Sequence, residues 1–161
     1  MPIHLQAITR ENFEAIAALE VHKSQWNYLA SNAYSIAEAS FDPSLHTRAI
    51  YCDARPVGFL MTHHPVGEAG AGHTVEIWRF MVDASEQGKG HGRAALRLVL
   101  DELRADPSVR RVGISYTPDN HVAQALYAGL GFVETAIDEA TGEMEAVLYL
   151  AAEGAERPAL G

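Results

Sequence analysis

Cysteine is nearly missing from this sequence: Cys52 is the only one in 161 residues, so no disulfide can form within the chain. A single unpaired thiol fits a reducing compartment. No apolar run approaches the roughly 20 residues that a membrane-spanning helix needs. Residues 1–4 also lack the charged and apolar regions of a signal peptide. We therefore expect a cytoplasmic protein that does not enter a membrane.

Positive charge is also scarce, with 12 Lys and Arg residues against 21 Asp and Glu and a formal net charge of −9. This balance argues against a nucleic-acid partner. Most of the excess acid follows Phe132. Such a patch can attract a cationic ligand or can serve solubility alone, and both interpretations stay open. The eight histidines form no metal-binding motif, because adjacent residues such as His63 and His64 face opposite ways on a strand; we expect no metal.

The most informative stretch combines a strand, a glycine turn and a helix. Residues 75–83 are rich in β-branched and aromatic side chains, which favours a strand. Glycine then occupies every second position from Gly88 to Gly92. Residues 96–103 repeat apolar side chains with the spacing of an amphipathic helix. This order aims free backbone N–H groups and a helix N-terminus at one point, which predicts a phosphate site.

The spacing of the glycines narrows the choice of phosphate ligand. A Walker A loop fails because Asp83 stands where its first glycine is needed, and a dinucleotide fingerprint fails at Arg93. The stretch does match Gln-x-x-Gly-x-Gly at Gln87, Gly90 and Gly92. This motif resembles the acetyl-CoA pyrophosphate loop of the GNAT superfamily of N-acetyltransferases. The alternative is a glycine-rich turn without a ligand.

The periodicity of the whole chain predicts an α/β (α+β) fold. We expect a single domain over residues 1–150, with a mixed, mostly antiparallel sheet of about seven strands and about four helices. Two helices come early, followed by the order βββαβαββ. Residues 67–72 form a flexible loop, and residues 151–161 form a short, loosely ordered tail. This order also resembles the GNAT acyl-CoA N-acyltransferase fold over nearly the entire chain.

Three local expectations accompany this fold. The first helix has a core face that includes Phe13. Residues 24–41 form one helical segment with Tyr34 and Phe41 on a common side. A hairpin turn at residues 53–56 joins two strands.

A second segment, residues 120–132, resembles the other GNAT signature. In that family the asparagine contacts the cofactor and the tyrosine lies near its sulfur. Three further segments are similar to segments of the bacterial diamine and spermidine N-acetyltransferases: residues 31–39, 57–61 and 79–83. The matching positions of the signature are Asn120, Ala123, Leu126, Tyr127, Gly131 and Phe132.

The resemblance implies an acetyl-CoA-dependent N-acetyltransferase that acts by direct attack in a ternary complex. The implied acceptor is a small cationic amine, a polyamine or diamine such as spermidine, and the implied assembly is a homodimer. The same chemistry on an amino acid, an antibiotic or a protein N-terminus is an alternative. A non-catalytic acetyl-CoA-binding module is another.

The predicted cofactor-binding residues come from three places. These places are the end of the central strand, the glycine loop and the second signature. If the central strand is splayed at its end, its N–H groups there are unpaired and can bind the cofactor. The side chains of the loop either contact phosphates or are simply solvated. The predicted set is Met81, Val82, Asp83, Gln87, Gly88, Lys89, Gly90, His91, Gly92, Arg93, Asn120 and Tyr127.

The catalytic candidates are one phenol and two carboxylates. Tyr127 can protonate the departing thiolate, although it lies on the apolar face of its helix and can also be a core residue. Glu76 on the central strand or Glu38 on the second helix can take the proton of the amine through water. Glu76 can instead be a structural partner of Arg79 or a solvated residue.

Overall fold

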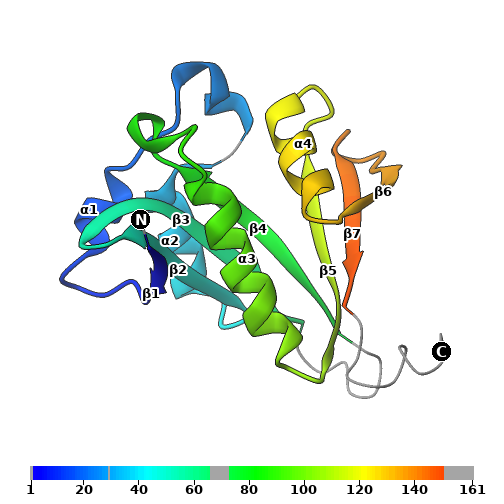
Figure 1. Cartoon of the computed structure of the whole chain (residues 1–161), viewed down its shortest axis with the longest axis horizontal. Helices are drawn as coiled ribbons and strands as arrows, with labels where there is room; N and C mark the ends of the chain where they lie inside the picture. Colours follow the sequence, from blue (N-terminus) through cyan, green and yellow to red (C-terminus); the bar gives the residue numbers. More distant parts are fainter. Residues whose placement is uncertain (1, 29, 66–72, 151–161) are drawn as a thin grey trace.

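The computed structural model describes residues 2–28, 30–65 and 73–150, and its seven strands form one sheet in the order β1-β2-β3-β4-β5-β7-β6 (Figure 1). Only β4 and β5 are parallel; the other neighbouring pairs are antiparallel. The predicted mixed, mostly antiparallel sheet is therefore confirmed. The strands are β1 (Ile3–Gln6), β2 (Leu45–Cys52), β3 (Arg55–His63), β4 (His73–Val82), β5 (Val109–Tyr116), β6 (Val133–Ile137) and β7 (Met144–Tyr149).

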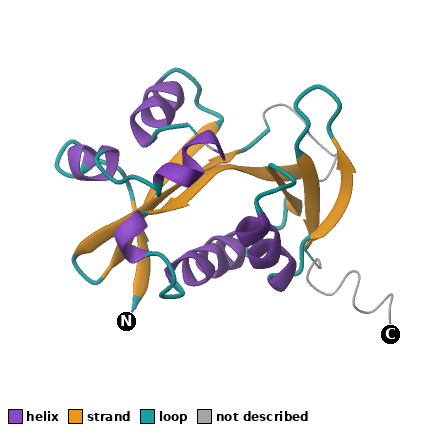
Figure 2. Ribbon diagram, turned by 90° about the horizontal axis from the view of Figure 1, so that it is seen from above, coloured by secondary structure: helices purple, strands orange, loops and turns teal. Residues whose placement is uncertain are grey.

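Helices cover both faces of the sheet (Figure 2). The helices and 3-10 turns are α1 (Phe13–Ala17), η1 (Lys23–Tyr28), α2 (Asn32–Ser40), η2 (Ala84–Glu86), α3 (His91–Arg104) and α4 (His121–Gly129). The larger core joins α3 and α4 to one face, and a smaller core joins α1 and α2 to the other. β4 contributes to both cores: Ile77 packs into the larger one and Met81 into the smaller.

Helix α3 buries the apolar stripe that its sequence predicts. Leu96, Val99, Leu100 and Leu103 are all buried in the larger core. Burial of one such side chain stabilises the fold by about 1.5–3 kcal/mol, so this helix is firmly fixed on the sheet. The glycine loop that precedes α3 is thereby held at the end of β4.

The sheet opens into a fork between β4 and β5. Their parallel pairing ends at Ile77 and Ile114, whereas β4 continues to Val82 and β5 to Tyr116. Beyond the last pair, β4 keeps its other neighbour, β3, as far as the pairing of Val82 with Gly58. The edge of β4 that faces β5 is therefore unpaired over the last residues of the strand, next to the glycine loop.

The close approach of β3 to this part of β4 depends on Gly58. A Cβ atom at Gly58 would lie 2.5 Å from the carbonyl oxygen of Met81, too near for any side chain without a shift of backbone. The missing side chain thus lets β3 support β4 directly opposite the fork.

A β-bulge changes the direction of Arg79. On β3, Met61 pairs with Arg79 but the next residue, Thr62, pairs with Ile77, so Trp78 is an extra residue of β4. A bulge breaks the alternation of side chains between the two faces of a sheet. Arg79 consequently reaches Glu38 of α2, on the face opposite α3.

The early helical region differs from its prediction. Residues 24–41 do not form one helix, because Ser31 caps a new helix by accepting a hydrogen bond from the N–H of Tyr34 at 3.1 Å. Tyr34 and Phe41 are both exposed, so their side of this segment is not part of the core. The predicted core face of the first helix is wrong at Phe13, which is exposed, whereas Ile16 is buried. α2 buries its polar residues Asn32 and Ser35 instead, which the apolar periodicity cannot anticipate.

The β2–β3 hairpin is tighter than predicted. β2 ends at Cys52 and β3 begins at Arg55, so the turn is Asp53–Ala54, with Asp53 at φ 56. The predictions for the loop of residues 67–72 and the tail of residues 151–161 lie outside the described residues. Among the helices of the described part, none combines the length and the apolar character needed to cross a bilayer.

Candidate active site

The first cavity, of about 310 Å³, lies at the open edge of β4. Its wall joins residues 21–25, the end of β4, the glycine loop and α4, four segments that are up to 106 positions apart in the sequence. Asp83 and Lys89 are the two predicted cofactor residues outside this wall. The predicted residues that it brings together are Met81, Val82, Gln87, Gly88, Gly90, His91, Gly92, Arg93, Asn120 and Tyr127.

Each glycine of the loop has its own structural reason. Gly88 and Gly90 adopt left-handed φ values of 80° and 86°, which glycine reaches without strain. Gly92 is needed for space, because a Cβ atom there would lie 3.1 Å from the ring of Phe80. Gly90 is the N-cap of α3 and offers no side chain to the first N–H groups of the helix. Those donors and the positive end of the helix dipole are available to an anion.

Gln87 ties the loop to β4. Its Nε2 donates hydrogen bonds to the carbonyl oxygen of Val82 at 2.9 Å and to Oε1 of Gln25 at 3.0 Å. The carbonyl of Val82 faces the open edge, where no β5 residue is present to pair with it. The side chain of Gln87 therefore substitutes for the missing strand and fixes the beginning of the loop.

The predicted unpaired N–H groups are fewer than the sequence suggested. The N–H of Asp83 donates to the carbonyl of Val57 at 2.8 Å, and the carbonyl of Met81 faces Gly58. Backbone groups alternate sides along a strand, so Val82 is the residue whose N–H points to the open edge. The prediction is wrong for Asp83, because its N–H is paired with β3.

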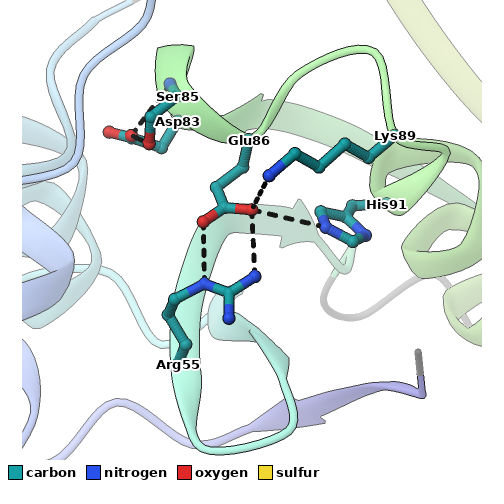
Figure 3. Close-up of polar contacts among 6 residues, drawn as sticks. All are labelled: Arg55, Asp83, Ser85, Glu86, Lys89 and His91. Atoms are coloured by element: carbon teal, nitrogen blue, oxygen red, sulfur yellow. Dashed lines mark hydrogen bonds and ion pairs between the residues drawn. The ribbon is translucent and has the colours of Figure 1, made fainter.

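The carboxylate of Asp83 is also engaged in hydrogen bonds within the protein. Its Oδ1 accepts the N–H of Glu20 at 2.9 Å, and its Oδ2 accepts the hydroxyl of Ser85 at 2.6 Å (Figure 3). These bonds close the η2 turn and hold the segment between α1 and η1 against it. Asp83 thus shapes the backbone that leads into the loop.

Glu86, which the sequence analysis passed over, organises the charged side chains of the loop. Its carboxylate is buried and is contacted by Arg55 at 2.7 Å, by Lys89 at 3.3 Å and by Nε2 of His91 at 3.4 Å (Figure 3). The pKa of Glu86 falls to about 2, chiefly because Arg55 donates hydrogen bonds to it. Lys89 and His91, both predicted as cofactor residues, therefore contact a carboxylate of the protein.

Arg93 lies at a different border of the cavity. A Cβ atom at Gly129 would come within 3.0 Å of its guanidinium, so Arg93 rests against the last turn of α4. The glycine at position 129 is what leaves room for this contact. Arg93 consequently connects the first turn of α3 with α4 across the cavity.

The second signature, residues 120–132, supplies another part of the wall of the first cavity. Asn120 caps α4 by accepting the N–H of Ala123 at 3.2 Å. Tyr127 is buried between the rings of Tyr116 and Phe132, whose centroids lie 5.5 and 6.0 Å away. Within the described residues its hydroxyl has no hydrogen-bond partner, and burial raises the pKa of this phenol. A neutral phenol at the cavity wall can donate a proton.

A second cavity, of about 430 Å³, lies where the fork begins. Ile77 and Ile114, the last paired residues of β4 and β5, both line it. Its acids come from β4 and from the turn before β7. The wall consists of Ala30, Glu76, Ile77, Trp78, Arg79, Ile114, Ser115 and Glu143.

The two predicted base candidates have different surroundings. Glu76 lines the second cavity, and its Oε1 accepts the indole N–H of Trp78 at 3.1 Å. Glu38 lies behind that wall and pairs with Arg79 at 3.1 Å. The interpretation of Glu76 as the partner of Arg79 is therefore wrong, since Glu38 is the carboxylate that holds this guanidinium.

A third cavity, of about 220 Å³, lies between the other two. It shares Met81 with the first cavity and Ala30 with the second. The third space thus borders each of the other two. In the described ranges, no group of three or more His, Cys, Asp or Glu side chains is placed to hold a metal ion.

Comparison with known proteins agrees with this geometry. A spermine/spermidine N(1)-acetyltransferase of Bacillus subtilis is 28% identical over 134 residues, which cover 82% of this chain and 88% of that protein. A mycothiol acetyltransferase of a Nocardioides species is 36% identical over 126 residues, covering 72% of this chain and 42% of that protein.

A solved structure gives a similar result for the fold. The spermidine N-acetyltransferase of Vibrio cholerae, in complex with CoA and spermine, superposes with a TM-score of 0.74 at 15% identity and covers 92% of this chain and 95% of its own. The resemblance to GNAT proteins, and to their spermidine-acetylating branch, is confirmed. Residues 8–132 match the family described as "Acetyltransferase (GNAT) family". The chain therefore belongs to the GNAT family and is an acetyl-CoA-dependent N-acetyltransferase.

Proposed function

We propose that this enzyme transfers the acetyl group of acetyl-CoA to a primary amine of a small cationic acceptor, a polyamine or diamine such as spermidine. The amine attacks the thioester directly in a ternary complex. The observation that carries the proposal is the arrangement at the fork. A glycine-loop cavity with Tyr127 and an acid-lined cavity with Glu76 and Glu143 border consecutive stretches of β4, residues 80–82 and residues 76–79.

The first cavity suits the donor. The backbone N–H groups of residues 88–92 and the N-terminus of α3 would bind the pyrophosphate. The free N–H of Val82 would pair with the pantetheine arm or with the thioester oxygen as negative charge develops on it. Asn120 uses its side-chain oxygen to cap α4, which leaves its amide nitrogen for the cofactor.

Two side chains carry the proton transfers, Tyr127 and Glu76. As the amine nitrogen bonds to the carbonyl carbon and the C–S bond breaks, Tyr127 gives its proton to the departing thiolate. The raised pKa of this phenol keeps it protonated before that step. Glu76 takes the proton of the amine through water, which is needed because an aliphatic amine has a pKa near 10.4.

The second cavity suits a cationic acceptor. Glu76 and Glu143 bring two carboxylates to its wall, and Trp78, whose ring stacks on His63, gives this wall an apolar part. Arg79 would oppose such a ligand, but Glu38 pairs with it. The role of Glu38 is thus to neutralise Arg79, so that the cavity stays acidic.

Another amine acceptor is the second candidate. The mycothiol acetyltransferase, which shares 36% identity over part of its length, supports the same chemistry on a different molecule. A non-catalytic module is disfavoured because Tyr127 and Asn120 both line the donor cavity. The homodimer and the cytoplasmic location stay predictions.

The first prediction concerns the glycine loop. Gly90→Val forces a β-branched residue into a left-handed conformation and should weaken CoA binding roughly tenfold or more. Calorimetric titration with CoA measures the effect. Gly142→Val is the matched control, because Gly142 also has a left-handed φ with open space around it but lies outside the loop. Unchanged affinity in a folded Gly90→Val variant would remove the loop from the site.

The second prediction concerns Tyr127. Tyr127→Phe keeps the buried ring and deletes the proton, so kcat should fall on the order of 10²-fold or more while CoA affinity is kept. Tyr116→Phe is the control: it deletes the neighbouring hydroxyl, which donates to Glu134 at 2.6 Å, and should leave kcat within a few-fold. Normal turnover of Tyr127→Phe would return this residue to a purely structural role.

The third prediction concerns the acceptor. Glu143→Gln and Glu38→Gln should each raise KM for spermidine about three- to fivefold, the range for a partly exposed charge pair, with little effect on acetyl-CoA. KM should also rise with ionic strength, because salt screens the attraction. Glu139→Gln is the control, since Glu139 is exposed in the same turn but outside the cavity wall.

A panel of acceptors measured by thiol release decides the substrate class. Spermidine, spermine and short diamines should give higher kcat/KM than neutral amino acids or a peptide N-terminus. If every polyamine fails while one of the other acceptors turns over well, the polyamine proposal is wrong.

A further inference from the structure

We propose that Arg55 is a positioning residue for acetyl-CoA binding although it lies outside the donor cavity. Arg55 holds the carboxylate of Glu86, and through Glu86 it fixes the loop conformation that residues 87–92 present to the pyrophosphate. This inference rests on the proposed location of the donor site. It adds a remote residue, at the β2–β3 hairpin, on which cofactor affinity depends.

Glu86 is the centre of the arrangement. Among the described residues it is the only acidic side chain that is buried. A carboxylate removed from water needs partners, and leaving one unpaired is strongly unfavourable. Three basic side chains surround it, from the hairpin, from the loop and from the start of α3 (Figure 3).

The three contacts are not equal. Arg55 donates from Nε at 2.7 Å and from Nη2 at 3.2 Å, a bidentate pair. Lys89 makes one longer contact at 3.3 Å, and Nε2 of His91 lies 3.4 Å away without a hydrogen bond. Arg55 is therefore the main anchor of Glu86, and its removal would leave the carboxylate with its two weaker partners.

The loop depends on this anchor at both ends. Glu86 directly precedes Gln87 at the beginning of the loop. Lys89 donates to its carboxylate from the middle of the loop, and Nε2 of His91 lies 3.4 Å from it at the end. With both side chains turned to Glu86, the backbone between them is left facing the cavity. A Glu86 that rotates into water would release the beginning and the end of the loop together.

Coupling of this kind is reciprocal. If the pair between Arg55 and Glu86 favours the cofactor-binding conformation, bound cofactor must stabilise the pair by the same free energy. The hairpin turn at Asp53–Ala54 should then exchange its amide hydrogens more slowly when CoA is bound. No direct contact between hairpin and cofactor is required for that effect.

The test is calorimetric titration of the full chain with CoA. Arg55→Gln should raise Kd about tenfold, the size of one lost charge-assisted pair, and kcat at saturating acetyl-CoA should stay within about twofold. Arg55→Lys keeps the charge but cannot form the bidentate pair, so it should also bind CoA more weakly than the unmodified protein.

Arg48→Gln is the matched control. Arg48 forms a bidentate pair of the same type with Glu102, at 3.0 and 3.2 Å, between β2 and α3 but outside the donor cavity. Arg48→Gln should change thermal stability by no more than Arg55→Gln does, because Glu102 is half exposed, and should leave Kd for CoA unchanged. Equal weakening by Arg48→Gln would reduce Arg55 to a general stabilising residue and overturn the proposal.

Two further outcomes would contradict it. Wild-type affinity of Arg55→Gln would show that the loop does not need the anchor, and full affinity of Arg55→Lys would show that charge alone matters. The Gly90→Val variant separates this failure from that of the donor site. If Gly90→Val weakens CoA binding and Arg55→Gln does not, only the role of Arg55 is refuted; if neither does, the proposed site is wrong.

Discussion

The loss of pairing between β4 and β5 beyond Ile77 and Ile114 is the constraint on which the site depends. A continuous ladder would occupy the backbone groups of Val82 and would close the space between the two strands. Because the strands separate, Gln87 can bind the carbonyl of Val82, and cavities can form beside the fork. The open edge leaves backbone N–H and C=O groups of β4 without a partner strand, and the glycine loop and the ligand can supply hydrogen-bond partners for them.

Ion pairs on the two sides of the fork have complementary effects. On the donor side, Glu86 pairs with Lys89 and lies beside the buried ring of His91, which leaves the loop backbone to meet an anion. On the acceptor side, Glu38 pairs with the guanidinium of Arg79 and leaves the carboxylates of the wall to meet a cation. In both places a paired charge determines which charge the cavity offers to its ligand.

The sequence predicted the features that depend on local pattern. The buried stripe of α3 and the glycine turn before it follow from periodicity and spacing, and they agree with the structure. The expectation that Tyr127 lies at the donor site came from the resemblance to the GNAT signature, and Tyr127 lines the first cavity. Features that depend on distant partners were missed. Arg55 is 31 positions from Glu86, and the bulge that turns Arg79 towards α2 leaves no trace in the alternation of residues. The exposed side of α2 was misjudged because buried Asn32 satisfies its polar group by donating to the carbonyl of Ile16.

The central claim is that donor and acceptor are bound together and react directly across the fork. Initial-velocity measurements with acetyl-CoA and spermidine, each varied at several fixed concentrations of the other, test it most directly. Transfer in a ternary complex predicts double-reciprocal lines that intersect. Parallel lines, with acetyl transfer to the protein in the absence of any amine, would indicate a covalent acetyl-enzyme and would contradict the account.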